Sequence, residues 1–284
     1  MTTTFLIEPS ELKNRLGEPG LRIFDTAVFL TPAKTGYRAD SGHAGYLEGH
    51  IPGAAFIDLI KAWSDTTSGL GFTLPSAPAL ASSVGASGIG NDHEVVLYSS
   101  GHMMWATRAW WMLRWLGLDN IRVLNGGLAA WKSAGGALSS GEQNYPSATV
   151  TARPRSGLFV NLEGMQESLD GGVCTVNALS RNLYTGEGNF NYGRAGHIPG
   201  SLHLHYEDLL IDGAFRSPLE LRQILTARGL LTKPRIVMYC GGGISATIDA
   251  FGCVLAGHPD VAVYDGSMSE WVRSGKPLIT GDSP

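Results

Sequence analysis

The sequence predicts two α/β domains in tandem, each a mostly parallel sheet with helices on both faces. Three observations predict it. The chain has 284 residues, more than a single domain of roughly 100 to 200 residues. Sequence motifs occur twice in the same order, and short apolar β-rich runs alternate with helix-like stretches. With 43% hydrophobic and 16% charged residues, each half has the composition of a globular domain that can bury its own core.

An internal repeat relates the two halves of the chain. Gly49–Ala54 (GHIPGA) returns as Gly196–Ser201 (GHIPGS), at an offset of 147 residues. Two further motifs are repeated. VVLYSSG at residues 95–101 returns as IVMYCGG at residues 236–242. VLNGGLAAWKSAGGAL at residues 123–138 returns as VYDGSMSEWVRSGKPL at residues 263–278. The offset falls to 140, so the first half has about seven extra residues between its first and second motifs. This pattern predicts a duplicated domain with an inserted loop.

A segment rich in Ser, Thr, Pro and Gly, residues 139–157, separates the halves. It has no apolar periodicity of the helical type, so we expect it to be a linker. The expected domains are residues 1–140 and 156–284.

Short apolar runs mark the expected strands. They lie at residues 21–27, 95–99 and 121–124 in the first half, and at residues 173–178, 235–240 and 261–265 in the second. Because these runs are apolar on both faces, we expect buried parallel strands between layers of helices. A helix expected over residues 105–116 places Trp111 and Trp115 on one face, which indicates packing in the core or between domains rather than a cofactor site.

Cys240 lies where an expected strand gives way to a glycine loop, Gly241 to Gly243, and then to a helix. Three successive glycines indicate a need for positive φ or for close backbone approach. Such a turn can direct several N–H groups inward and form an anion nest at the positive end of the helix. A thiolate or persulfide would be stabilised there, which makes Cys240 a candidate nucleophile. The alternative is a small apolar residue at a strand end.

The pattern CxxGx(S/T)A that begins at Cys240, with GHIPG upstream and DGxxxEW downstream, resembles the rhodanese superfamily. The resemblance covers nearly the whole chain and implies two tandem rhodanese-like domains. In tandem members a catalytically silent first domain precedes a second domain, whose loop cysteine takes sulfur from a donor and passes it to an acceptor. Ser99 stands at the first-half position that matches Cys240, so we expect the first domain to form no persulfide.

The resemblance implies a sulfurtransferase that works through a Cys240 persulfide. It would move a sulfane sulfur from a small anionic donor, 3-mercaptopyruvate or thiosulfate, to a thiophilic acceptor such as cyanide or a thiol. The loop residues expected to bind the substrate are Gly241, Gly242, Gly243, Ile244 and Ser245. Two alternatives stay open: a non-catalytic rhodanese-like binding module, and a carrier that receives its sulfur from a partner protein. The presence of Cys240 with its glycine loop argues against the first alternative.

Residue spacing disfavours two related chemistries. Phosphatases that share this fold carry an arginine six residues after the cysteine, where this chain has Ala246. A redox Cys-x-x-Cys pair needs a second cysteine where Gly243 stands. We expect the other two cysteines, Cys174 and Cys253, to belong to the core.

Because the expected donors are anions, we expect cationic side chains or N–H donors around Cys240. Arg181 and Arg194 are the nearest candidates in the second half. In related mercaptopyruvate enzymes, two arginines in this segment resemble a carboxylate clamp. Alignment on the preceding strand and the GHIPG turn puts Leu183 and Phe190 at those positions.

The loop after Cys240 resembles the mercaptopyruvate type, CG(S/A)G(V/I)(S/T). It lacks the basic residues that follow the cysteine in vertebrate-like thiosulfate enzymes. Gly242 stands where some mercaptopyruvate enzymes carry a serine, so it offers no hydroxyl for a serine-based proton relay. The loop therefore gives a slight preference for 3-mercaptopyruvate as donor.

Four histidines are candidates for functional residues. His50 and His197 belong to the GHIPG motif of both halves, which indicates a structural turn rather than a catalytic base. His203 and His205 would face one side of an extended strand, with the spacing of a metal pair. The sequence shows no third ligand, so we expect neither a metal nor another cofactor.

Charge and composition limit the partners. The formal net charge is −4 and no basic run is present, so we expect no binding to nucleic acid or to membranes. The sequence shows neither a secretory signal nor a segment that approaches the ~18 apolar residues of a membrane span. Three scattered cysteines leave at least one free thiol and favour a reducing, cytoplasmic setting.

Overall fold

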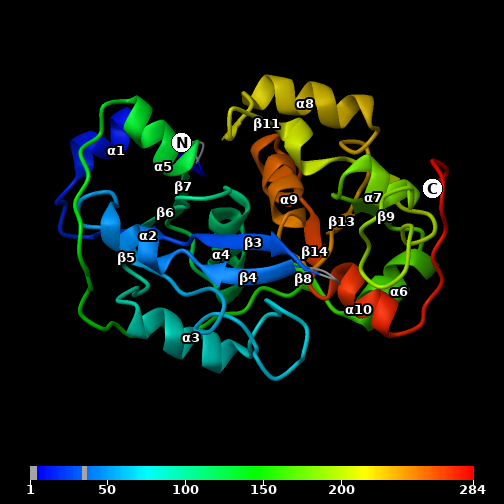
Figure 1. The fold of residues 1–284 in the computed structure, drawn as a ribbon, viewed down its shortest axis with the longest axis horizontal. Coiled ribbons are helices and arrows are strands. Elements are labelled where there is room, and N and C mark those ends of the chain that lie inside the picture. Colours follow the sequence, from blue (N-terminus) through cyan, green and yellow to red (C-terminus); the bar gives the residue numbers. More distant parts are fainter. Residues whose placement is uncertain (1–4, 34–36) are drawn as a thin grey trace.

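The computed structural model describes residues 5–33 and 37–284, which form two domains of the same architecture (Figure 1). Each domain is built on a five-stranded sheet, with strand order β1-β7-β6-β2-β5 in the first and β10-β9-β13-β14-β8 in the second. Read from its other edge, the second order matches the first strand by strand. All pairs within both sheets are parallel, as the apolar runs predicted.

In the first domain the sheet strands are β1 (Leu6–Ile7), β2 (Leu21–Asp25), β5 (Ala55–Phe56), β6 (Glu94–Tyr98) and β7 (Ile121–Leu124). The helices are α1 (Pro9–Arg15), α2 (His43–Glu48), α3 (Ala77–Ala86), α4 (Met104–Leu116) and α5 (Gly127–Ser133). A separate antiparallel hairpin consists of β3 (Val28–Pro32) and β4 (Tyr37–Ser41). The three strands expected in this half correspond to β2, β6 and β7, and the expected helix begins one residue earlier than predicted.

In the second domain the sheet strands are β8 (Phe159–Val160), β9 (Cys174–Asn177), β10 (Leu202–His203), β13 (Ile236–Tyr239) and β14 (Val261–Tyr264). The helices are α6 (Leu162–Asp170), α7 (Arg181–Thr185), α8 (Pro218–Ala227), α9 (Ala246–Leu255) and α10 (Ser267–Arg273). A 3-10 helix η1 (Tyr206–Leu209) leads into a short hairpin of β11 (Leu210–Ile211) and β12 (Ala214–Phe215). The three strands expected in this half correspond to β9, β13 and β14.

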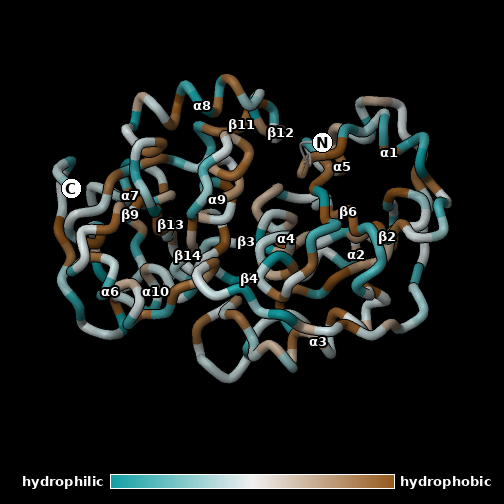
Figure 2. The backbone as a smooth tube through the Cα atoms, turned by 180° about the vertical axis from the view of Figure 1, so that it is seen from behind, coloured by the Kyte–Doolittle hydropathy of each residue, from teal (hydrophilic) through white to brown (hydrophobic). Residues whose placement is uncertain are grey.

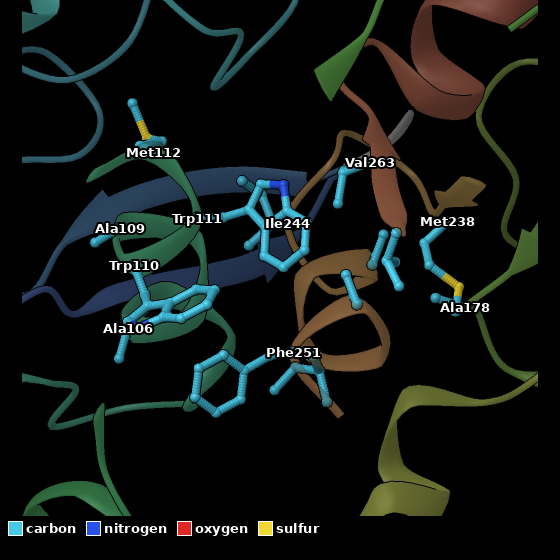
Figure 3. Close-up of a cluster of buried hydrophobic side chains, with 14 of the residues drawn as sticks. Ala106, Ala109, Trp110, Trp111, Met112, Ala178, Met238, Ile244, Phe251 and Val263 are labelled. Atoms are coloured by element: carbon cyan, nitrogen blue, oxygen red, sulfur yellow. The ribbon is translucent and has the colours of Figure 1, made fainter. Parts of the chain in front are cut away.

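The helices α4 and α9 pack against each other and join the two domains through one hydrophobic core (Figure 3). Trp110 meets Phe251 edge to face, with ring centroids 4.7 Å apart. Trp111 donates from Nε1 to the carbonyl oxygen of Leu158 at 2.8 Å, and Trp115 packs edge-on against Phe159. The predicted packing role of Trp111 and Trp115 is thus confirmed.

Amphipathic helices cover the outer sides of these layers. Hydrophobic and hydrophilic residues alternate along α8, which packs on α9 (Figure 2). Its side chains Leu221 and Leu225 are fully buried, as expected of a helix with one apolar face. Within the described ranges, every helix is too short or too polar to cross a lipid bilayer.

The linker lies extended along the first domain before it enters β8 (Figure 1). The Tyr145 hydroxyl donates to the carbonyl oxygen of Gly53 at 2.6 Å and accepts from the N–H of Ile23 at 3.0 Å. Further along, the N–H of Arg153 donates to the carbonyl oxygen of Leu116 at 2.8 Å. These hydrogen bonds fix the linker to the first domain.

The inserted loop, residues 57–76, contains no helix or strand and crosses to the second domain. The N–H of Leu74 donates to Asp265 Oδ2 at 2.8 Å, and Arg273 Nη2 donates to the carbonyl oxygen of Gly69 at 2.8 Å. The extra residues of the first half therefore form a bridge between domains.

Candidate active site

A cavity of about 250 Å³ lies between the two domains, with Cys240 in its wall. The residues of the second domain that line it are Tyr192, Cys240, Gly241, Gly242, Ile244, Ser245 and Ser269. Those of the first domain are Leu30, Tyr37, Gly71, Phe72, Met104 and Trp105. The structure thus brings four of the five predicted loop residues to the cavity, and the fifth, Gly243, belongs to the same turn. We call this space the interdomain cavity.

The loop that follows Cys240 keeps its N–H groups free. The main-chain N–H groups of residues 241–245 donate to no acceptor in the described part of the chain. The carbonyls are bound elsewhere: Cys240 O accepts from the N–H of Met268 at 3.0 Å, and Gly241 O accepts from the N–H of Ser269 at 2.9 Å. Helix α9 begins directly after the loop. Free N–H groups at a helix N-terminus are the arrangement that stabilises an anion.

Two of the loop glycines are required by their surroundings. Gly243 has φ +75°, and a Cβ there would lie 2.4 Å from the carbonyl oxygen of Asp265. A Cβ on Gly241 would lie 2.0 Å from the hydroxyl oxygen of Tyr192. A side chain at either position would therefore displace the loop or the cavity wall.

Ser267, which the sequence analysis missed, holds the start of the loop. Its hydroxyl oxygen accepts from the N–H of Cys240 at 3.1 Å and donates to the carbonyl oxygen of Tyr264 at 2.8 Å. Ser267 has φ +50°, a conformation that non-glycine residues rarely adopt and that concentrates at functional sites.

A buried arginine from the first domain, Arg108 on α4, supports the loop from behind. Its Nη1 donates to the carbonyl oxygen of Gly243 at 3.2 Å. Its Nη2 donates to the carbonyl oxygen of Phe72 at 2.6 Å and to Asp265 Oδ1 at 2.7 Å. Phe72 has φ +63°. Arg108 therefore links α4, the inserted loop and the cysteine loop, and nothing in the sequence distinguishes it from Arg114 on the same helix.

In the matching loop of the first domain, which begins at Ser99, side chains already accept hydrogen bonds from the loop N–H groups. The N–H of Ser100 donates to Asp25 Oδ1 at 3.1 Å, and the N–H of Gly101 donates to Ser99 Oγ at 3.1 Å. Burial raises the pKa of the Asp25 carboxyl to about 6, so it is mostly ionised at neutral pH. In the second domain the neutral amide of Asn177 occupies the matching strand end. The first loop thus already holds an anion, and the second does not.

The structure does not bring Arg181 or Arg194 to Cys240. Arg181 pairs with Asp282 at 2.6 Å in a separate cavity, and Arg194 Nη1 donates to the carbonyl oxygen of Lys276 at 2.8 Å. No charged side chain of the described residues lines the interdomain cavity.

The two residues aligned with the arginine clamp, Leu183 and Phe190, are both apolar. Phe190 packs against Tyr37 with ring centroids 4.7 Å apart, and Leu183 packs against the main hydrophobic core. These positions therefore contribute apolar contacts.

The two GHIPG histidines are buried and bind main-chain carbonyls. His50 Nε2 lies 3.1 Å from the oxygen of Gly141, and His197 Nε2 lies 3.1 Å from the oxygen of Ser283. Each histidine thus holds the segment that follows the last helix of its own domain. These contacts agree with the predicted structural role.

The second histidine pair does not share the extended strand that was predicted, because β10 ends at His203 and His205 precedes η1. His203 Nε2 lies 2.7 Å from the oxygen of Leu179. Both side chains line the cavity that contains Arg181. Among the described residues, no group of three His, Cys, Asp or Glu side chains is placed to hold a metal ion.

The other two cysteines lie in apolar surroundings. Cys253 is fully buried, and burial raises the pKa of its thiol well above the usual range. Cys174 is half-buried, and burial also raises the pKa of its thiol. Both environments disfavour a thiolate.

Comparison with known proteins agrees with this geometry. The model of the rhodanese-like domain family matches residues 8–134 and 185–274. A probable 3-mercaptopyruvate sulfurtransferase of Pseudomonas aeruginosa is 37% identical over 99% of this chain and 100% of that protein. The thiosulfate sulfurtransferase of Mus musculus is 35% identical over 98% of this chain and 93% of that protein.

A solved structure shows the same two-domain fold. SseA from Escherichia coli, one of the 3-mercaptopyruvate sulfotransferases with the rhodanese fold, superimposes with a TM-score of 0.81 at 30% identity. The match covers 93% of this chain and 99% of that chain. With the family model on both halves and relatives along nearly the whole length, the chain belongs to the rhodanese family and is a sulfurtransferase with two tandem rhodanese domains.

Proposed function

We propose that this protein transfers a sulfane sulfur through a persulfide on Cys240. The donor is a small anion, 3-mercaptopyruvate or thiosulfate, and the acceptor is cyanide or a thiol. The observation that carries the proposal is the set of free N–H groups of residues 241–245 beside Cys240 in the interdomain cavity. The relatives named for these two donors support it.

The reaction is covalent catalysis in two steps. The Cys240 thiolate attacks the transferable sulfur of the donor, and a new sulfur–sulfur bond forms. The bond from that sulfur to the rest of the donor breaks, and the electron pair leaves on sulfite or on the pyruvate enolate, which takes a proton from water. The acceptor then attacks the outer sulfur, and the electron pair of the broken bond returns to Cys240. Preorganised N–H groups stabilise the anionic sulfur at each stage.

Donor binding is assigned to the loop N–H groups rather than to a guanidinium. Arg181→Ala and Arg194→Ala are therefore expected to change kcat/KM for either donor by less than about twofold. The Arg181–Asp282 ion pair and the hydrogen bond from Arg194 to the Lys276 carbonyl are exposed and lie away from the cavity, so they contribute little. Steady-state kinetics with 3-mercaptopyruvate and with thiosulfate, each with cyanide as acceptor, test both the activity and this expectation. A selective increase of about tenfold in KM for 3-mercaptopyruvate in either variant would instead assign that arginine to a carboxylate clamp. A lack of turnover with every donor would contradict the enzymatic proposal and favour a binding module.

The first domain is proposed to be catalytically silent. Ser99→Cys in a Cys240→Ser background is expected to give no turnover above the background protein. The new thiol would lie in a loop in which the N–H of Ser100 is already bound by the buried Asp25 carboxylate. A neighbouring anion disfavours a thiolate. Cyanide-dependent turnover that approaches the unmodified enzyme would show that the first loop can support chemistry.

The position of Cys240 favours small molecules over a partner protein as sulfur source. The residue is only 2% exposed, and residues of both domains line the space in front of it. A protein donor would have to insert a segment between the domains. Three free cysteines in the described chain fit the proposed cytoplasmic, reducing setting.

A further inference from the structure

Tyr192 places its hydroxyl group in the wall of the interdomain cavity, beside the cysteine loop. The residue lies in the segment before GHIPG and lines the cavity together with Cys240 and Gly241. Its hydroxyl oxygen is the atom closest to the position that a Cβ on Gly241 would occupy, at 2.0 Å. The phenol is thus held against the loop residue that directly follows the proposed nucleophile.

The ring of Tyr192 is fixed by its neighbours. It meets Phe190 edge to face with ring centroids 5.4 Å apart, and Phe190 packs on Tyr37 of the hairpin at 4.7 Å. The Tyr192 ring also packs against the main hydrophobic core. Because these contacts involve the ring and not the hydroxyl, a phenylalanine at this position would keep them.

The hydroxyl itself has no hydrogen-bond partner within residues 5–33 and 37–284, and no hydrogen bond contributes to its pKa. The hydroxyls of Tyr145, Tyr184 and Tyr239, in contrast, all bind groups of the protein. A tyrosine hydroxyl in a closed site usually has a partner. Its position in the cavity wall therefore indicates that the partner is a bound ligand.

The Tyr192 hydroxyl keeps its proton during the reaction. Burial raises its pKa far above the usual value, and a negative charge on Cys240 raises it further. A protonated phenol donates a hydrogen bond to an anion without adding a charge to the site. Tyrosine is one of the side chains that stabilise a developing oxyanion in this way.

Other polar side chains of the cavity are less suited to this role. Ser269 already donates its hydroxyl to the carbonyl oxygen of Gly241 at 2.7 Å, Ser245 belongs to the loop around the sulfur, and Tyr37 is 44% exposed. Among the described residues no Lys or Arg lines the cavity. The negative charge that a donor carries beyond its transferable sulfur must therefore be met by neutral donors, and Tyr192 is anchored and free to act as one.

We propose that Tyr192 is a catalytic residue of the loading step, in which its hydroxyl donates a hydrogen bond to the leaving group of the sulfur donor. With thiosulfate the acceptor is an oxygen of the departing sulfite, and with 3-mercaptopyruvate it is the carbonyl oxygen that becomes the enolate. The bond from Cys240 to the transferred sulfur forms while the bond from that sulfur to the leaving group breaks, and the electron pair stays on the leaving group. The phenol keeps its proton, and the enolate takes one from water. This inference rests on the proposed function, because it assigns a residue to its first step.

The two donors should respond differently to the loss of this hydrogen bond. The oxygens of thiosulfate are negatively charged before and after the bond breaks, so the hydrogen bond stabilises the bound donor and the transition state alike. Its loss should mainly raise the half-saturating concentration of thiosulfate. The carbonyl oxygen of 3-mercaptopyruvate becomes negative only as the bond breaks, so the loss should mainly lower the maximal loading rate.

The test measures the two steps separately in the full-length protein and in Tyr192→Phe. Release of sulfite or pyruvate without an acceptor gives the rate of loading, and thiocyanate formation from loaded protein and cyanide gives the rate of unloading. We expect Tyr192→Phe to lower the ratio of maximal loading rate to half-saturating concentration at least about tenfold with both donors, the usual effect of losing a hydrogen bond to a charged group. Unloading should change by less than about twofold.

Tyr206→Phe is the matched control. Tyr206 is also partly buried in the second domain and packs on His102 and His205, but it does not line the interdomain cavity. Its variant should change neither step by more than about twofold, and circular dichroism checks that both variants are folded. Equal losses in the two variants would show that removal of any nearby hydroxyl disturbs the site, and the inference would be wrong.

The remaining outcomes separate this inference from the proposed function. If the unmodified protein took up no sulfur from either donor, both would be overturned. If it loaded normally and Tyr192→Phe loaded equally well, or lost loading and unloading to the same extent, the inference alone would fail. A loss confined to the half-saturating concentration of 3-mercaptopyruvate would place the hydroxyl on the donor's carboxylate and contradict the assignment to the leaving oxygen.

Discussion

Replacement of Cys240 by serine is expected to abolish sulfur transfer, with a loss of at least about a thousandfold in kcat/KM. No other group at the site can replace the cysteine thiolate as the covalent nucleophile. The same change should remove the single sulfur atom that donor treatment adds to the protein. Cys240 is the one cysteine that contacts both the interdomain cavity and a loop with free N–H groups in the described chain. Turnover with cyanide and intact mass after donor treatment measure the two effects.

The other cysteines supply the controls. Burial raises the pKa of the thiols of Cys174 and Cys253, so Cys174→Ser and Cys253→Ala should keep both the added sulfur and most of the turnover. Circular dichroism of each variant checks that it is folded. Sulfur found on Cys174 or Cys253, with Cys240 unmodified, would contradict the assignment.

The sheets could be predicted from the sequence because parallel strands covered on both faces leave uninterrupted apolar runs. All four residues of β13 are buried, and the strand pairs with β9 and β14 on its two sides. The loop after it was predictable for a similar local reason. Glycine at 243 is required by positive φ and by close approach of the Asp265 carbonyl, and such requirements appear directly as residue type.

The first-domain half of the cavity could not be predicted, because it depends on contacts between residues far apart in the chain. Phe72 reaches the cavity only because the inserted loop crosses to the second domain, where Leu74 binds Asp265. Trp105 reaches it because α4 packs on α9. Neither event leaves a local pattern. The repeat indicated an insertion, but not the direction in which the loop runs.

The positions of the arginine side chains could not be predicted either, because closeness in sequence does not fix the direction of a side chain. Arg181 was a candidate because it is one of the nearest arginines of the second half, yet it begins α7 and pairs with Asp282. The asymmetry between Asp25 and Asn177 was visible in the sequence. Its meaning required the structure, which shows that the Asp25 carboxylate accepts a loop N–H.

The division of labour between the domains follows from these contacts. In the proposed mechanism the first domain contributes no nucleophile, but it supplies six of the residues that line the cavity. It also supplies Arg108, which binds the carbonyl oxygen of Gly243 behind the cysteine loop. Activity should therefore depend on the contacts that hold the two domains together. The Arg108–Asp265 pair is central among them, because it connects α4, the inserted loop and the cysteine loop.

Asp265→Ala is expected to lower the free energy of unfolding by about 3 to 5 kcal/mol, the usual effect of leaving a buried charge without its partner. The side chain of Arg108 is 2% exposed and that of Asp265 is 15% exposed, so solvent compensates the lost ion pair poorly. The variant also removes the acceptor for the N–H of Leu74. Because the inserted loop then loses an anchor, sulfur transfer should fall together with stability. Urea unfolding followed by tryptophan fluorescence measures the first effect, and cyanide turnover the second.

Two further variants separate the buried charge from a general loss of contacts. The double variant Arg108→Met with Asp265→Leu removes both charges and should recover part of the stability lost in Asp265→Ala, because no unpaired charge stays buried. Asp40→Ala breaks the exposed pair with Arg38 and should change the free energy of unfolding by less than about 1 kcal/mol. If Asp265→Ala were no more harmful than Asp40→Ala, the pair would not hold the inserted loop against the second domain, and the first-domain wall of the cavity would depend on other contacts.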